Sequence, residues 1–123
     1  MHLRDRQRLF ALATMFAAIL AAPSAWAHAH LDGSAPAAQS VGASPSAITL
    51  HFTEALEAKF SGFEITDARG AKVNVKSKAD PANAALLVAP LSTPLAAGPY
   101  QVSWHIVAKD GHRMQGSYSF TVK

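Results

Sequence analysis

The sequence predicts a single all-β domain, an antiparallel β-sandwich, preceded by an export signal. Several short segments alternate apolar and polar residues with a period of two, and no stretch of residues 28–123 has the spacing of an amphipathic helix. Residues that form turns recur about every ten positions. Six or seven short strands spaced in this way are typical of a β-sandwich.

The segment before the domain has the three-part pattern of a secretory signal peptide. Arginines precede residues 9–22, which are apolar and small, and small residues at Ala25 and Ala27 form a cleavage site. The apolar run is roughly 14 residues long, whereas about 20 are needed to span a bilayer. We therefore expect residues 1–27 to be a cleaved signal peptide rather than a membrane anchor.

The position of the cut decides which residue begins the mature chain. Cleavage after Ala27 leaves His28 at the N-terminus, with His30 two residues downstream. Cleavage after Ala29 also fits the small-residue pattern, and it leaves His30 first. Both cuts leave a histidine with a free amine.

Composition excludes several classes of function. The formal net charge of +3 falls to about +1 for residues 28–123, because the signal contains three Arg and one Asp. A nucleic-acid binder would have a basic patch, so we expect no such partner. The chain has no Cys, which excludes disulfides and thiolate metal sites. The length predicts one soluble domain over residues 28–123.

The first four predicted strands follow from local patterns. In residues 48–53, Ile, Leu and Phe alternate with Thr and His, and the alternation resumes in residues 63–65. Two valines alternate with Lys and Asn in residues 72–76, which predicts a strand there. Residues 84–88 form a more continuous apolar run, which also predicts a strand.

The last two strands show the clearest alternation. Residues 100–106 place Trp104 on the inward face, as a core residue, and His105 on the outward face. His51 has the outward parity in its own strand, and residues 118–122 repeat the pattern. Turn residues separate the strands at 43–45, 67–70, 80–83 and 97–99.

Two features point to a metal site. An N-terminal His28 offers an amine and an imidazole that can chelate a metal together. Asp110-Gly111-His112 directly follows the strand that ends near Val107. In an extended segment, residues two apart face the same side, so Asp110 and His112 can converge on one ion. Asp-Gly is also a common turn signal, and that interpretation stays open.

The donor types favour copper. Imidazole nitrogens, an amine and a carboxylate suit Cu(II) in a tetragonal arrangement, whereas Ca²⁺ and Mg²⁺ prefer oxygen ligands. Zinc would also accept these donors, although it prefers a tetrahedral geometry. Copper is the first choice, with binding rather than catalysis as the function.

Several motifs in register carry a resemblance to a known family. They are His28-Ala29-His30-Leu31 leading to Ser34-Ala35-Pro36-Ala37, residues 48–54, Phe60-Ser61-Gly62, Tyr100-Gln101-Val102-Ser103-Trp104 running into Lys109-Asp110-Gly111-His112, and residues 116–122. With these motifs, residues 28–123 resemble the CopC family of periplasmic copper-binding, copper-resistance proteins.

The resemblance implies a Greek-key β-sandwich or barrel of cupredoxin or immunoglobulin-like type, with one Cu(II) per chain at one pole. Its implied ligands are the amine and imidazole of His28, the imidazole of His112 and the carboxylate of Asp110. It also favours the cut after Ala27. The implied function is to buffer periplasmic copper or pass it to an inner-membrane protein of the CopD type.

Two further residues are candidates for the metal site. Glu54 keeps the core-facing parity of residues 48–52 but lies just past the strand end, so it is either a ligand, a neighbour of the site or a solvated charge. His30 is either an alternative copper ligand, with His28 as the terminus, or a residue at a strand start beside the site.

The sequence lacks a second, methionine-rich Cu(I) site that the resemblance associates with some family members. Residues 66–78 contain no Met and no His, and Met114, which remains after signal removal, is expected to pack against the domain. Thioether ligands are what select Cu(I). We therefore expect Cu(II) alone.

Two other functions remain as alternatives. An N-terminal His and a second His on a β-sandwich are similar to the histidine brace of copper oxidases. However, the chain has no row of aromatics for a glycan, and Asp110 as a ligand would close the position that oxygen needs. The other alternative is an immunoglobulin-like interaction module that binds no metal.

Overall fold

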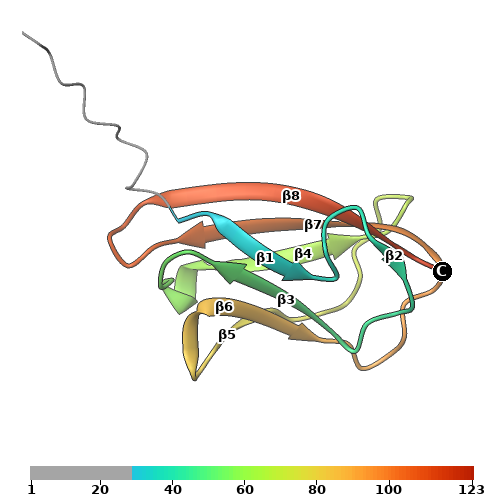
Figure 1. Cartoon of the computed structure of the whole chain (residues 1–123), viewed down its shortest axis with the longest axis horizontal. Coiled ribbons are helices and arrows are strands. Elements are labelled where there is room, and N and C mark those ends of the chain that lie inside the picture. The colour runs from blue at the N-terminus through green and yellow to red at the C-terminus, as the bar shows by residue number, and fades with distance from the viewer. Residues whose placement is uncertain (1–28) are drawn as a thin grey trace, which may run out of the picture.

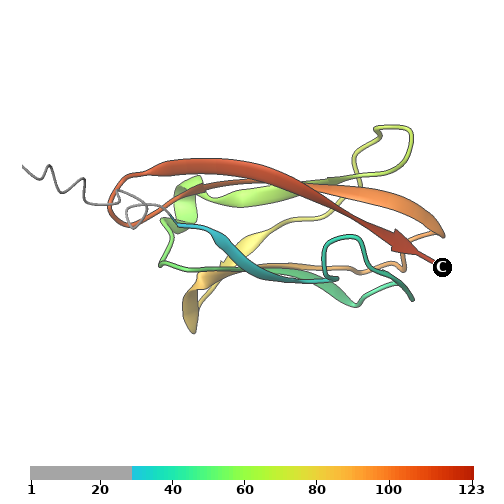
Figure 2. The ribbon, with the colours of Figure 1, turned by 45° about the horizontal axis from the view of Figure 1, so that its top comes forward.

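The alternating segments form two four-stranded sheets that face each other, in a computed structural model that describes residues 29–123 (Figures 1 and 2). The strands are β1 (Leu31–Ala35), β2 (Val41–Gly42), β3 (Ala47–Phe52), β4 (Gly62–Thr66), β5 (Lys78–Asp80), β6 (Asn83–Pro90), β7 (Gly98–Val107) and β8 (Arg113–Val122). One sheet has the order β1-β3-β6-β5 and the other β2-β8-β7-β4. The predicted β-sandwich is confirmed.

Inward-facing residues of both sheets form one apolar core. Along β3 and β7 every second side chain is buried, as the period of two predicts. Trp104 is only 9% exposed, and its indole meets the ring of Phe52 edge to face, with centroids 5.2 Å apart. The contact joins β7 of one sheet to β3 of the other, which confirms Trp104 as a core residue.

The structure corrects two details of the predicted strands. Residues 73–76 form no strand. Lys72 makes a single bridge to Thr66, and the chain then crosses to the other sheet, where β5 begins at Lys78. The alternation arises because Val73 and Val75 pack against the core from an irregular segment. The second correction is that β2 pairs with β8 in parallel, so the sandwich is not wholly antiparallel.

The signal-peptide prediction concerns residues 1–27 and lies outside the described residues. Within residues 29–123, no helix has the length and apolar character needed to cross a membrane. The helical element of this part is a single turn, η3 (Ala58–Phe60), between β3 and β4.

Tyr118 of β8 carries a hydroxyl group that the fold buries without a hydrogen bond to the described residues. The adjacent Ser34 donates its own proton to the Pro36 carbonyl at 3.0 Å. Burial raises the pKa of Tyr118 above its usual value of about 10, and Ser34 offsets part of the rise. An uncompensated buried hydroxyl costs folding free energy of about 1–3 kcal/mol.

We expect Tyr118→Phe to leave stability unchanged or to raise it, because it removes this hydroxyl. Because folding raises the pKa of Tyr118, the folded state favours the neutral hydroxyl. Ionisation of Tyr118 therefore lowers the stability of the fold as pH rises above about 10. Thermal melts at neutral pH and near pH 11 test both points. The expected pattern is that the variant loses less stability than the parent at high pH. A lower melting temperature for the variant at neutral pH would contradict the proposed cost.

Candidate metal centre

The tip of the β7–β8 hairpin brings Asp110 and His112 together. The last pair of the hairpin is Val107 and Arg113, and residues 108–112 form the connection. The Ala108 amide donates to the His112 carbonyl at 2.9 Å, and the Gly111 amide donates to the Ala108 carbonyl at 2.8 Å. Gly111 has φ of +91°, a left-handed conformation that favours glycine. The segment is therefore a turn, which confirms the turn interpretation of Asp110-Gly111, whereas the extended conformation is wrong.

Within this turn both oxygens of Asp110 face His112. Oδ1 accepts the His112 backbone amide at 3.0 Å, and Oδ2 lies 2.9 Å from the ring nitrogen Nδ1. When Nδ1 carries the proton and donates to the carboxylate, Nε2 carries the lone pair that can bind a metal. Metal-binding histidines commonly donate their second ring nitrogen to a carboxylate in this way. Both side chains are about half exposed, at 44% and 47%, which suits an ion that arrives from solvent.

Residues 53–57 connect this hairpin tip to the start of β1. On one side, the Thr53 amide donates to the His30 carbonyl at 2.9 Å, and the His30 amide donates to Thr53 Oγ1 at 2.9 Å. On the other side, the Lys109 amide donates to the Ala55 carbonyl at 3.1 Å. The hairpin tip, the start of β1 and the end of β3 therefore lie at one end of the sandwich (Figures 1 and 2). We call this end the hairpin pole.

Glu54 and His30, the two further candidates, lie at or near the hairpin pole. Glu54 is half-buried and lies between Thr53 and Ala55, whose backbone atoms make these contacts. As expected, it lies past the end of β3 at Phe52. His30 is exposed beside Thr53. His28, the first predicted ligand, lies outside the described residues. No cluster of three or more His, Asp or Glu side chains suited to a metal occurs between residues 29 and 123.

The two remaining histidines of the described residues, His51 and His105, lie on the outer faces of the two sheets. His51 pairs with Asp32, with Nδ1 and Oδ2 3.2 Å apart, and both side chains are exposed. The alternating pattern does not reveal this pair, because Asp32 sits at an irregularity in the β1–β3 register. His105 is exposed on β7. Met114 is partly buried against the core, as predicted.

Comparison with known proteins gives the same family by sequence and by structure. The model of the CopC domain matches residues 31–123. Protein YobA of Escherichia coli K12 is 42% identical over 120 residues, with 96% of each chain covered. Copper resistance protein C of Pseudomonas syringae pv. tomato is 38% identical, with 89% of this chain and 93% of the relative covered.

Two crystal structures have a similar fold. PcoC from Escherichia coli, described as a methionine-rich copper resistance protein, has a TM-score of 0.71 and 39% identity, and the match covers 79% of this chain and all of PcoC. CopC from Methylosinus trichosporium OB3b has a TM-score of 0.72 and 31% identity, with 78% of this chain and 94% of that protein covered.

Proposed function

This chain belongs to the CopC family, and from that premise we propose that it is a periplasmic Cu(II)-binding protein of copper homeostasis or resistance. The observation that carries the proposal is the Asp110–His112 pair, which lies at the hairpin pole, where the chain enters the first strand. A chain cut before His28 would begin two residues ahead of His30, which lies at the same pole.

The donors available at the hairpin pole fit Cu(II). We propose that one ion per chain is held by the amine and imidazole of His28, the imidazole of His112 and the carboxylate of Asp110. Glu54 and His30 stand beside this set as additional candidates. Three nitrogens and an oxygen are a donor set that Cu(II) accepts in a tetragonal plane, whereas thioethers would be needed to select Cu(I).

The absence of a methionine cluster supports a role limited to Cu(II). In the described part of the chain Met114 is the single methionine, and it packs against the core. PcoC, by contrast, is described as methionine-rich. We propose that this chain binds and releases copper without catalysing a reaction, and that it buffers the ion or passes it to an inner-membrane transporter of the CopD type.

Cu(II) titration of the processed protein tests the proposal. The protein is produced with its own leader, recovered from the periplasmic fraction, and its mass determined to establish the first residue. We expect one tightly bound Cu(II) per chain and a spin-resonance spectrum with nitrogen hyperfine structure. A mature protein that binds no stoichiometric Cu(II) would refute the proposal, and sustained hydrogen peroxide production with a reductant would favour the oxidase alternative.

Asp110→Asn separates the charge of this side chain from its role in the turn. The amide oxygen of Asn can still accept the His112 amide, so the turn is kept while the negative charge beside the ring is lost. We expect Cu(II) affinity to fall at least about 10- to 100-fold, because the variant loses both a charged ligand oxygen and the carboxylate partner of the His112 ring. The matched control is Asp32→Asn, which alters the similar pair with His51. Equal losses in both variants would contradict the assignment.

Copper affinity is expected to fall in acid. The amine and the imidazoles bind copper only when deprotonated, and imidazole in model peptides has a pKa of about 6.5. Affinity measured from about pH 8 to pH 5 should therefore decrease steadily, with the steepest change below about pH 6.5. Calorimetry in buffers of different ionisation enthalpy should show proton release on binding. A flat profile would argue against nitrogen ligands.

A further inference from the structure

A groove lies on the outer face of the β4-β7-β8 sheet, next to the hairpin pole. Its volume is about 540 Å³. The residues that line it are Lys59, Phe60, His105, Ile106, Val107, Arg113, Met114 and Gln115. Arg113 directly follows His112, so the groove begins where the proposed copper site ends.

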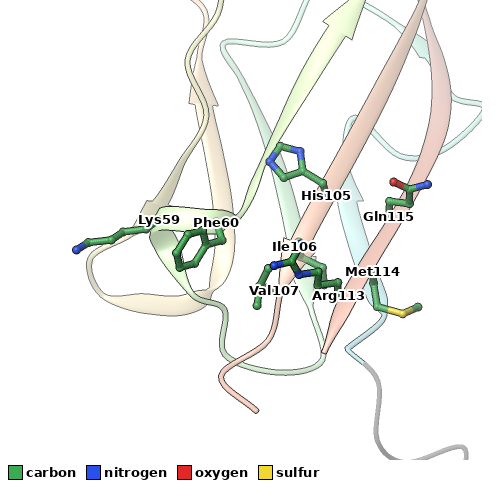
Figure 3. Close-up of a pocket in the computed structure, with 8 residues that line it drawn as sticks. All are labelled: Lys59, Phe60, His105, Ile106, Val107, Arg113, Met114 and Gln115. Atoms are coloured by element: carbon green, nitrogen blue, oxygen red, sulfur yellow. The ribbon is translucent and has the colours of Figure 1, made fainter. Parts of the chain in front are cut away.

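The groove has an exposed aromatic side chain on one wall. Phe60 is 63% exposed, one of two large apolar residues that the described part leaves so open, the other being Val41 at 61%. In Figure 3 its ring, on η3, faces the side of the groove formed by His105, Val107 and Arg113. An exposed apolar group rimmed by polar residues is typical of an interaction site.

The charged residues of the groove are all basic. Its lining contains Lys59 and Arg113 and no Asp or Glu. Neither cation forms an ion pair with residues 29–123. Of the other cations in this range, Arg69, Lys72 and Lys109 each pair with a carboxylate, and Lys76, Lys78 and Lys123 do not. Glu57, two residues before Lys59, pairs instead with Lys109, with Nζ and Oε1 3.6 Å apart. The positive charge of the groove is thus uncompensated and favours an acidic partner.

We propose that this groove docks an acidic peptide segment of a partner protein, with an apolar side chain of that segment packed against Phe60. A free anion would pair with Arg113 but leave Phe60 in water. Proteins usually enclose most of the surface of a small molecule that they bind. The side chain of Phe60 is too exposed to enclose one. Aromatic and Arg side chains are also the residues that contribute most to binding at protein interfaces.

The groove lies next to the proposed copper site, which gives the docking a role in copper exchange. A segment held at Arg113 lies beside His112, so its protein is placed next to the ion that it would receive or deliver. This role in copper exchange rests on the proposed function, whereas the docking itself depends only on the groove. The two can therefore fail separately.

Selection of peptides from a random display library on the metal-free processed protein tests the docking. We expect the enriched peptides to carry two or more Asp or Glu residues around an aliphatic or aromatic residue. A synthetic peptide of that sequence should shift the amide resonances of Phe60, His105 and Arg113 in the labelled protein. Enrichment of sequences without acidic residues, or resonance shifts confined to another face, would overturn the proposal.

Matched variants separate specific docking from general electrostatics. Lys59→Glu with Arg113→Glu should weaken peptide binding at least about tenfold. Arg69→Glu with Lys123→Glu makes the same change in net charge away from the groove lining and should leave binding nearly unchanged. Phe60→Ser should also weaken binding, whereas Val41→Ser, at a residue of similar exposure on β2, should not. Equal losses in the control variants would overturn the proposal.

Three further measurements distinguish the proposed docking from other occupants of the groove and from copper binding. If sedimentation shows a dimer of the parent that Phe60→Ser converts to a monomer, the groove binds a second copy and the proposal fails. If millimolar citrate competes as well as the peptide, the groove is an anion site and the proposal also fails. Cu(II) titration of Lys59→Glu and Phe60→Ser should match the parent, since neither residue is a proposed ligand. Copper binding without peptide binding would overturn the docking alone, and the reverse result would overturn only the proposed function.

Discussion

A single residue added ahead of His28 is expected to weaken Cu(II) binding by orders of magnitude. The addition converts the free amine of His28 into an amide, which removes one donor and breaks the chelate ring that the amine forms with the imidazole. The addition alters no side chain of the proposed site, so any loss of affinity is due to the amine. The loss should be accompanied by fewer nitrogen couplings in the spin-resonance spectrum.

The measurement compares two proteins prepared with a removable tag, one that begins at His28 and one that begins with an extra Ala. A third protein, with the extra Ala after Lys123, controls for the added residue. Lys123 ends the chain one residue beyond β8, at the end of the sandwich opposite the hairpin pole (Figure 1). Equal Cu(II) affinity of all three proteins would show that the N-terminal amine is not a ligand.

Much of the fold could be predicted because burial imposes a period of two on strands. In β3 and β7 the alternation in the sequence coincides with alternating burial, and Trp104 was placed correctly by parity alone. The same rule fails at residues 73–76. There, two valines in an irregular crossover are partly buried against the core, so apolar alternation reports burial without a hydrogen-bonded ladder. The two-residue strand β2 is too short to produce any pattern.

The candidate site was predictable in its residues but not in its geometry. The spacing of Asp110 and His112 indicated that they could converge, yet they meet through a turn with a left-handed Gly111 and not through an extended strand. The contacts that place this turn beside the start of β1 are made by backbone atoms of Thr53 and Ala55. Backbone contacts leave no signature in residue type, which is why only the structure shows them. The groove at Phe60 likewise joins residues that are distant in sequence.

Gly116→Ala is expected to destabilise the sandwich strongly. Gly116 lies opposite Trp104 in the β7–β8 ladder, and the indole ring lies over it. A Cβ built on Gly116 would be 2.4 Å from Cζ2 and 2.8 Å from Cε2 of that ring, well inside any contact distance. The ring cannot simply rotate away, because it is buried and meets Phe52. Overpacking of this kind costs about 1–3 kcal/mol, and more where the neighbour is rigid.

Gly33→Ala is the matched control for this substitution. A Cβ on Gly33 of β1 meets no atom within 4 Å, and its φ is not in the left-handed region. We therefore expect its unfolding free energy to stay within about 0.5 kcal/mol of the parent. Thermal and urea unfolding of the two variants gives the comparison. Similar stabilities for both would show that the strand pair accommodates a side chain at Gly116 without displacing the indole.

A double-mutant cycle with Trp104→Leu identifies the indole as the cause. Alone, Trp104→Leu removes a large buried side chain and is destabilising because it leaves a cavity. In the double variant the methyl group added at position 116 no longer meets a ring, so the two costs should not add, and we expect a coupling free energy of about 1–3 kcal/mol. Additive costs would place the strain in the β7–β8 backbone instead.

The same cycle tests whether core packing affects the proposed copper site. Trp104 packs on Phe52, and Phe52 directly precedes Thr53, whose amide donates to the His30 carbonyl. A displaced indole in Gly116→Ala should therefore disturb the hairpin pole and lower its Cu(II) affinity, and relief of the strain in the double variant should restore both. We expect the double variant to recover Cu(II) affinity relative to Gly116→Ala alone. Unchanged Cu(II) affinity across the whole cycle would show that the hairpin pole is insensitive to the packing of the indole.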